Sequence, residues 1–238
     1  MVRWVVIGDA RDQPRLTPKG ERTRARIVAA AARLIHQRSV AGTTLDDVKA
    51  AAEVSGSQLY HYFPDKDDLV QAVIDHQART IAGNQGQADL GTAGGLRAWR
   101  DTVIAQADAT GGAGGCPLGS LAGQLAETDP RARARIAAGF EQWSAAISEG
   151  ARRLQAAGHL PASIDADDYA ITLLAVLQGG LLLAQVQQDT RPLQTAVDTL
   201  LALTARSDSW CSEHGARQPP CTSRGRQSSA PGHDRSDG

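Results

Sequence analysis

The sequence has little of what secreted, zinc-binding and membrane proteins need. Its 238 residues include three cysteines, Cys116, Cys211 and Cys221, which are too few and too scattered for a disulfide framework or a zinc site. No apolar run approaches the roughly 20 residues of a membrane span, and the apolar stretch at residues 4–7 is too short for a signal peptide. We therefore expect a cytoplasmic protein with no membrane partner and no bound metal.

An excess of charge of one sign is also missing. The formal net charge is −1, so there is no global electrostatic argument for a nucleic-acid partner. The distribution is uneven, however, because residues 1–38 hold nine Arg or Lys residues against three acids. Such a basic segment indicates local phosphate binding. The alternative is that residues 19–26 are only the solvated face of a helix.

Long β-branched runs are absent, whereas Ala, Leu and Gln are abundant, so we expect an all-α fold. A Gly-rich linker is expected at residues 82–95, and nothing after residue 206 has enough apolar surface to fold. The expected helices, from caps, apolar spacing and breakers, are residues 19–36, 45–52, a short helix capped by Ser55, 66–84, 95–110, a short helix opening at Pro117, 130–157, 166–187 and 192–205.

Aromatic residues are scarce, at 4% of the chain, but they gather in one short helix. Ser55 is suited to cap this helix, and Pro64 ends it. Within it, Leu59 and Phe63 lie four residues apart and should face a core. The opposite side then presents short polar side chains, and a glutamine there can pair bidentately with adenine in the major groove of DNA.

The order of these features resembles a known family. The run Thr43-Thr44-Leu45-Asp46-Asp47-Val48, continued by residues 52–66 and Leu69, closely resembles the helix-turn-helix domain of TetR-type transcriptional repressors over residues 20–77. Two later segments, Gly-Cys-Pro-Leu-Gly-Ser-Leu-Ala at 115–122 and Leu-Gln-Gly-Gly-Leu-Leu-Leu-Ala at 177–184, resemble the C-terminal domain of the LmrA/YxaF-like subgroup. One departure is Gly56-Ser57-Gln58, where the family often has Lys-Gly-Thr.

The resemblance implies an all-α homodimer with a three-helix DNA-binding head and a larger helical body that binds ligand and dimerises. The implied domains are a helix-turn-helix DNA-binding domain (18–80) and a ligand-binding and dimerisation domain (81–206), whereas composition predicts a flexible arm (1–17) and a disordered tail (207–238). The implied function is a repressor that a hydrophobic or aromatic inducer releases from a palindromic double-stranded operator. The alternative is a body that binds a protein partner instead of a small molecule.

No clustered nucleophiles or acids accompany these helices, so we expect neither an enzyme nor a cofactor site. The residues expected to contact DNA are Thr43, Thr44, Ser55, Ser57, Gln58, Tyr60, His61 and Lys66. The residues expected to contact ligand are Trp99, Val103, Cys116, Phe140, Trp143, Ile147, Leu174, Gln178 and Leu182. For Cys116 and for the stripe from Phe140 to Ile147, packing alone is the alternative. The pair Gly179-Gly180 indicates a close helix–helix approach, either at the dimer interface or over a pocket.

Overall fold

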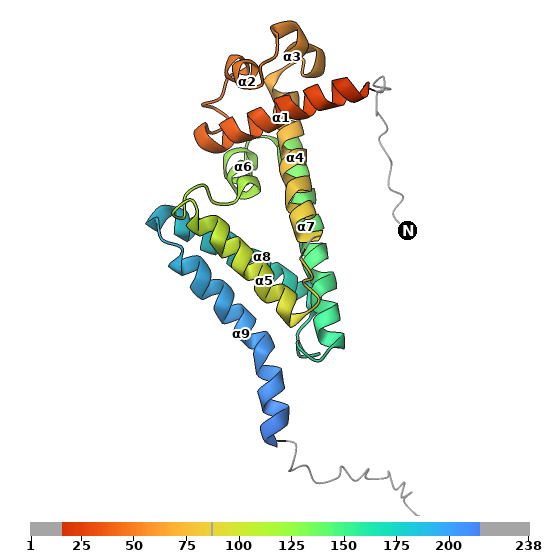
Figure 1. Ribbon diagram of the computed structural model, residues 1–238, viewed down its shortest axis with the longest axis vertical. Coiled ribbons are helices and arrows are strands. Elements are labelled where there is room, and N and C mark those ends of the chain that lie inside the picture. Colours follow the sequence, from red (N-terminus) through yellow and green to blue (C-terminus); the bar gives the residue numbers. More distant parts are fainter. Residues whose placement is uncertain (1–15, 87, 215–238) are drawn as a thin grey trace, which may run out of the picture.

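The computed structural model describes residues 16–86 and 88–214, which form α-helices joined by short turns (Figure 1). The helices are α1 (Pro18–Arg38), α2 (Leu45–Ala51), α3 (Gly56–Tyr62), α4 (Lys66–Gly86), α5 (Ala93–Asp108), α6 (Pro117–Leu125), α7 (Pro130–Ala156), α8 (Ala166–Gln187) and α9 (Arg191–His214). The all-α prediction is confirmed for these residues.

Local capping explains where most of these helices begin. The Thr17 hydroxyl accepts a hydrogen bond from Gly20 N and Pro18 occupies the first turn of α1, where proline costs no backbone hydrogen bond. Asp65 accepts from Asp68 N at the start of α4. Asp129 accepts from two backbone N–H groups at the start of α7. These caps satisfy donors that a helix leaves unpaired at its first turn.

The head consists of α1, α2, α3 and the first half of α4. Its core contains Ile27, Val48, Leu59 and Phe63, each at most 1% exposed. The continuous helix α4 leaves this core and runs down beside α7 into the body (Figure 1). The domain boundary that we predicted at residue 80 therefore falls inside a helix, and the head is joined to the body by that rigid element.

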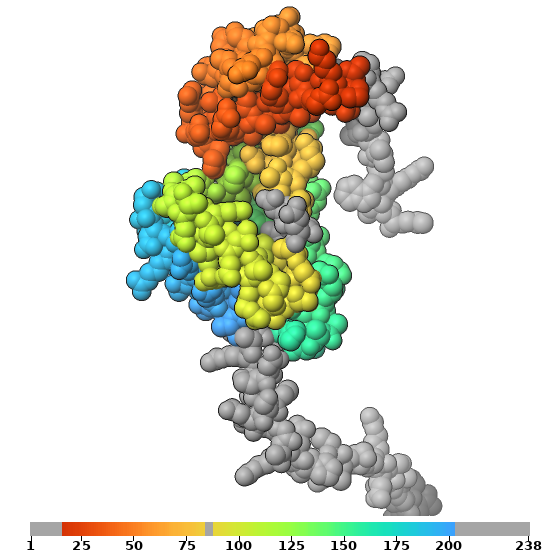
Figure 2. All heavy atoms as spheres, in the orientation of Figure 1, coloured from red at the N-terminus to blue at the C-terminus, as the bar shows by residue number. Residues whose placement is uncertain are grey.

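The body packs α8 between α7 and α9, with α5 lying on the near face (Figures 1 and 2). Gly180 lets α8 approach α9, because a Cβ at this position would lie 2.9 Å from Leu193 Cα. Gly179 has open space beside it. Among the described helices, α8 alone is long and apolar enough to cross a membrane by length and composition, and the core helix of a soluble protein passes the same test.

Two predicted boundaries differ from the structure. We expected disorder from residue 207, but α9 continues to His214, because residues 206–214 contain no glycine or proline to end an established helix. We expected a linker from residue 82, but α4 continues to Gly86, since one glycine inside a helix is tolerated. The predictions for residues 1–15 and 215–238 lie outside the described residues.

Candidate DNA-binding and ligand-binding sites

The helices α2 and α3 form a helix-turn-helix whose turn is fixed by the backbone. Glu53 adopts a left-handed conformation with φ 51°, and Val54 N donates to Lys49 O at 3.2 Å. In α3, Leu59 and Phe63 are each 1% exposed, so this face packs into the head. Arg24 of α1 lies over the Phe63 ring at 5.1 Å and adds a cation–π contact that the sequence pattern had not indicated.

The opposite face of α3 is solvent-exposed. Ser57, Gln58 and His61 are exposed, and Tyr60 keeps 57% of its surface accessible. The Tyr62 ring packs edge-on against His61, at 4.9 Å between centroids, and is half-buried. Lys66, at the first position of α4, is also half-buried. The side chains expected to reach DNA are thus gathered at one end of the molecule.

A reciprocal cap holds the start of α3. Ser55 Oγ accepts from Gln58 N at 3.2 Å, and Gln58 Oε1 accepts from Ser55 N at 2.9 Å. Such a capping box satisfies two orphan donors at once. The oxygen of Gln58 is therefore already hydrogen-bonded within the helix, whereas its amide nitrogen is not needed for the cap.

A second capping box starts α2. Thr44 Oγ1 accepts from Asp47 N at 3.1 Å, and Asp47 Oδ2 accepts from Thr44 N at 2.9 Å. The Thr44 hydroxyl also donates to this carboxylate at 2.6 Å. These bonds to Thr44, with a smaller contribution from Arg38, lower the pKa of Asp47. The exposed Thr44 side chain lies at the helix start, as predicted.

The expected DNA contact at Thr43 is not supported by its position. Thr43 is only 2% exposed, and its hydroxyl donates to Ser39 O at 2.8 Å. The sequence could not separate the two adjacent threonines, because both are suited to a helix start. Thr44 takes the capping position, and Thr43 instead closes the turn between α1 and α2.

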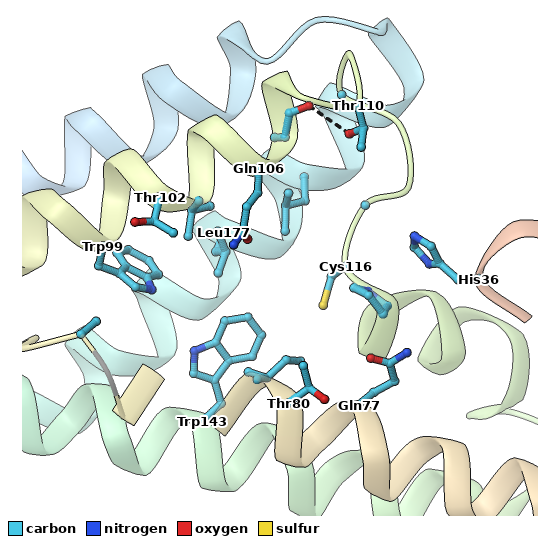
Figure 3. A pocket seen from close by; sticks show the side chains of 18 of the residues that line it. His36, Gln77, Thr80, Trp99, Thr102, Gln106, Thr110, Cys116, Trp143 and Leu177 are labelled. Carbon is cyan, nitrogen blue, oxygen red and sulfur yellow. Dashed lines mark hydrogen bonds between the residues drawn. The ribbon is translucent and has the colours of Figure 1, made fainter. Parts of the chain in front are cut away.

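A cavity of about 650 Å³ lies in the body below the head (Figure 3). Four of the residues expected to contact ligand line it: Trp99, Val103, Cys116 and Trp143. The indole rings of Trp99 and Trp143 lie at one end (Figure 3). The volume falls within the roughly 300–1,000 Å³ of typical ligand pockets.

Five residues expected at the ligand site are not among the lining residues: Phe140, Ile147, Leu174, Gln178 and Leu182. Phe140 stacks against Trp143 at 6.4 Å between centroids, and Ile147 is 2% exposed in the core. Leu182 points outward and is 60% exposed. The helical periodicity was correct, but it could not indicate which face of each helix meets the cavity.

The two remaining positions lie close to the cavity wall but do not form it. Gln178 faces α6, where a Cβ on Gly119 would lie 2.5 Å from its Oε1. Leu174 is half-buried against the core, whereas Leu177 and Leu181, one turn and two turns further along α8, line the cavity. The prediction therefore selected the right helix but the adjacent face.

The polar lining was largely missed from the sequence. Thr102 and Gln106 lie three and seven residues after Trp99 on the same face of α5, so helical spacing could have found them. His36 of α1 could not have been found, because nothing local connects it with the body. The polar lining residues are His36, Gln77, Thr80, Asp89, Thr102, Gln106 and Thr110.

The described lining contains no Lys or Arg, and Asp89 is its one carboxylate. That carboxylate lies 3.6 Å from Arg153 Nη1. In the described residues, no group of three or more His, Cys, Asp or Glu side chains is placed to hold a metal ion. The cavity is thus suited to an organic ligand without phosphates, bound by apolar contact and neutral hydrogen bonds.

Both halves of the chain match known protein families. Residues 27–73 match the family described as bacterial regulatory proteins, tetR family, and residues 93–200 match the tetracyclin repressor-like C-terminal domain. An HTH-type transcriptional regulator of Mycobacterium tuberculosis is 31% identical over 179 residues, which are 71% of this chain and 88% of that protein. The chain belongs to the TetR family. The members of this family are DNA-binding transcriptional regulators that act as dimers.

Solved structures of TetR-family proteins share the fold. A regulator from Chloroflexus aurantiacus superposes with a TM-score of 0.67 at 27% identity, covering 78% of this chain and 96% of that chain. A TetR regulatory protein from Rhodobacter sphaeroides has a TM-score of 0.70 at 23% identity, covering 76% of this chain and 98% of that chain.

A further relative was identified by its sequence. The HTH-type transcriptional repressor DhaR of Mycobacterium sp. strain GP1 is 24% identical over 161 residues, which are 66% of this chain and 79% of that protein.

Proposed function

We propose that this TetR-family protein is a cytoplasmic repressor that a hydrophobic or aromatic small molecule releases from a palindromic operator. The observation that carries the proposal is the combination of two features in one chain. The outer face of α3 is polar and exposed, and a cavity of about 650 Å³ with two indole rings in its wall lies in the body. The first suits DNA, and the second suits an aromatic ligand.

On the DNA side, the proposed base contacts are Ser57, Gln58 and His61, and the proposed phosphate contacts are Tyr60 and Lys66. Ser55 and Thr44 cap the starts of α3 and α2, and helix starts favour anions. A dimer would place two such α3 helices in successive major grooves, about 34–36 Å apart. Phosphate contacts make this affinity fall with salt.

For the dimer, we propose the outer face of α8. Four large apolar residues of this helix are exposed: Ile171, Leu182, Leu183 and Val186, with 60%, 60%, 48% and 73% of their surfaces accessible. They recur at helical spacing on one side, and Gly179, which has open space beside it, lies among them. An exposed apolar stripe of this kind marks an interaction surface, and a second copy of α8 would bury it.

On the ligand side, the two tryptophans and the leucines of α8 favour an aromatic or hydrophobic inducer. To reverse operator occupancy from 99:1 to 1:99, the ligand must prefer the released state by about 5.5 kcal/mol. Two cavities per dimer would divide this requirement. A body that binds only a protein partner is not favoured, because a lined cavity of about 650 Å³ is present.

We also propose membership of the LmrA/YxaF-like subgroup. The two sequence segments that suggested it, residues 115–122 and 177–184, approach one another in the structure at Gly119 and Gln178. A Cβ added to Gly119 of the first would meet Gln178 Oε1 of the second at 2.5 Å. This close approach supports a joint role of the two segments in shaping the body beside the cavity.

A mobility-shift experiment with DNA from upstream of the gene tests the proposal. The double variant Gln58→Ala/His61→Ala should lose specific binding, whereas Gln142→Ala, on the exposed surface of α7, should bind as the wild type does. If the double variant binds this DNA unchanged, the assigned recognition face is wrong. Aromatic compounds added to the same assay test release.

A further inference from the structure

His36 belongs to the head but lines the cavity in the body. It lies in the last turn of α1, and of the described lining residues it alone comes from α1, α2 or α3. Figure 3 places it with Cys116 and Gln77 at the opposite end from Trp99 and Trp143. A ligand that extends from the indoles past Cys116 would therefore touch the DNA-binding head itself.

The loop between α5 and α6 packs against His36. Gly114 has φ +91°, and a Cβ at this position would lie 2.8 Å from His36 Nε2. The neighbouring Gly112, Ala113 and Gly115 line the cavity, so the loop forms part of its wall. The loop and the imidazole are therefore neighbours at this end of the cavity.

The α1–α2 turn that follows His36 has a strained backbone and is hydrogen-bonded to a helix of the body. Ser39 has φ 72° and ψ 167°, a region that residues other than glycine rarely adopt. Val40 N donates to Gln124 Oε1 of α6 at 2.7 Å. Cys116, the N-cap of α6, and Pro117, its first residue, line the cavity. His36, which precedes the turn, thus lines the cavity, and the residue after Ser39, Val40, is hydrogen-bonded to α6, whose first residue also lines it.

The cavity has two chemically different ends along this path. The indole end carries two aromatic rings beside the hydroxyl of Thr102, and the opposite end offers an imidazole and the amide of Gln77 (Figure 3). With no Lys or Arg in the described lining, a phosphate-rich ligand would remain unpaired, which is costly in a partly enclosed site. The lining fits an elongated aromatic molecule that carries a hydrogen-bond acceptor at its far end.

We propose that the ligand is such a two-ended aromatic molecule, and that its polar end binds His36 and thereby displaces the strained α1–α2 turn. This inference rests on the proposed function and adds how a ligand bound in the cavity changes the DNA-binding head. Contact with the indoles gives affinity, and contact with His36 gives release. A ligand that fills only the indole end therefore binds without releasing DNA.

The test uses 6-propionyl-2-(dimethylamino)naphthalene, an uncharged, elongated two-ring aromatic with a carbonyl acceptor at one end, as the probe. Its fluorescence reports binding, and anisotropy of labelled DNA from upstream of the gene reports release. The variants are His36→Ala, His36→Gln, Gln37→Ala as a neighbouring exposed control that does not line the cavity, and Thr102→Trp, which fills the indole end. The melting temperature and the probe-free DNA affinity of each variant are measured first.

We expect the probe to bind wild type and Gln37→Ala and to release DNA from both, and Thr102→Trp to lose probe binding. The loss of one hydrogen bond should weaken probe binding to His36→Ala by roughly two- to tenfold. At saturating probe this variant should keep its DNA, and His36→Gln, which retains a donor, should recover release.

Four results would overturn the inference, and they separate it from the proposed function. In the first result, His36→Ala saturated with probe releases DNA as the wild type does. In the second, probe that fills the wild-type cavity releases no DNA. Either result means that probe bound to His36 does not cause release of DNA, and the proposed function stands. If the probe does not bind the wild type, or binds Thr102→Trp equally well, the cavity is not an aromatic-ligand site, and both fail.

Discussion

The substitution Gln58→Glu separates the two roles that the structure gives to Gln58. The side-chain oxygen of Gln58 accepts from Ser55 N at 2.9 Å and closes the α3 cap, and glutamate at this position also forms capping boxes. The amide nitrogen is free of that role and is the group that would donate to adenine N7. Glutamate keeps the cap and removes the donor.

The expected magnitudes differ widely between the two roles. Because the cap is retained and an acid is favourable near a helix N-terminus, the free energy of unfolding should change by less than about 0.5 kcal/mol. Losing the contact with one base pair costs about 1–3 kcal/mol. Two heads per dimer would then lose about 2–6 kcal/mol, which is roughly a 30-fold to 10⁴-fold loss of affinity.

The assays are urea unfolding for stability and anisotropy titration of labelled upstream DNA for affinity. Gln142→Glu makes the same chemical change on an exposed part of α7 and controls for the added charge. Gln58→Ala should in addition lose stability, by about 0.5–1 kcal/mol, because one half of the capping box is gone. If Gln58→Glu binds upstream DNA with wild-type affinity and base preference, Gln58 does not read the operator.

Three further predictions concern stability. Ser39→Gly should be more stable to urea than Ser39→Ala by about 1–3 kcal/mol, because only glycine relieves the positive φ of 72°; equal stability would show that the turn is not strained. Gly180→Ala should lower the free energy of unfolding by about 1–3 kcal/mol through its clash with α9, whereas Gly123→Ala in α6, with nothing within 4 Å, should not. Burial, with a smaller contribution from Arg79, lowers the pKa of His76 below its ordinary 6.5. The stability from this group is therefore complete above about pH 6.5 and falls as the pH drops below it, and His76→Gln should reduce that loss in a pH series of thermal melts.

The head was predictable because its signals are local. Ser55, Asp65 and Pro64 mark the ends of short helices through their own backbone chemistry, and the four-residue spacing of Leu59 and Phe63 determines which face of α3 is buried. The structure has each of these features. Thr43 and Thr44 could not be distinguished from the sequence, because the cap and its neighbour are the same residue type.

The ligand site was only partly predictable because it depends on how distant helices face one another. Trp99 and Trp143 were found, since large aromatic residues on helix faces are few in this chain. Leu182 was misplaced because α8 is apolar on all sides, so periodicity cannot distinguish its inner from its outer face. His36 was missed because it reaches the cavity only through tertiary packing of α1 above the α5–α6 loop.

The most direct test of the central claim is a footprint of the wild-type dimer on DNA from upstream of its gene, at low and moderate salt. The account predicts protection of a palindrome whose half-sites are about 34–36 Å apart on one face of the duplex. It also predicts that protection weakens as salt rises and disappears when an aromatic inducer is added. Protection without two-fold symmetry, protection insensitive to salt, or no protection at all would contradict it.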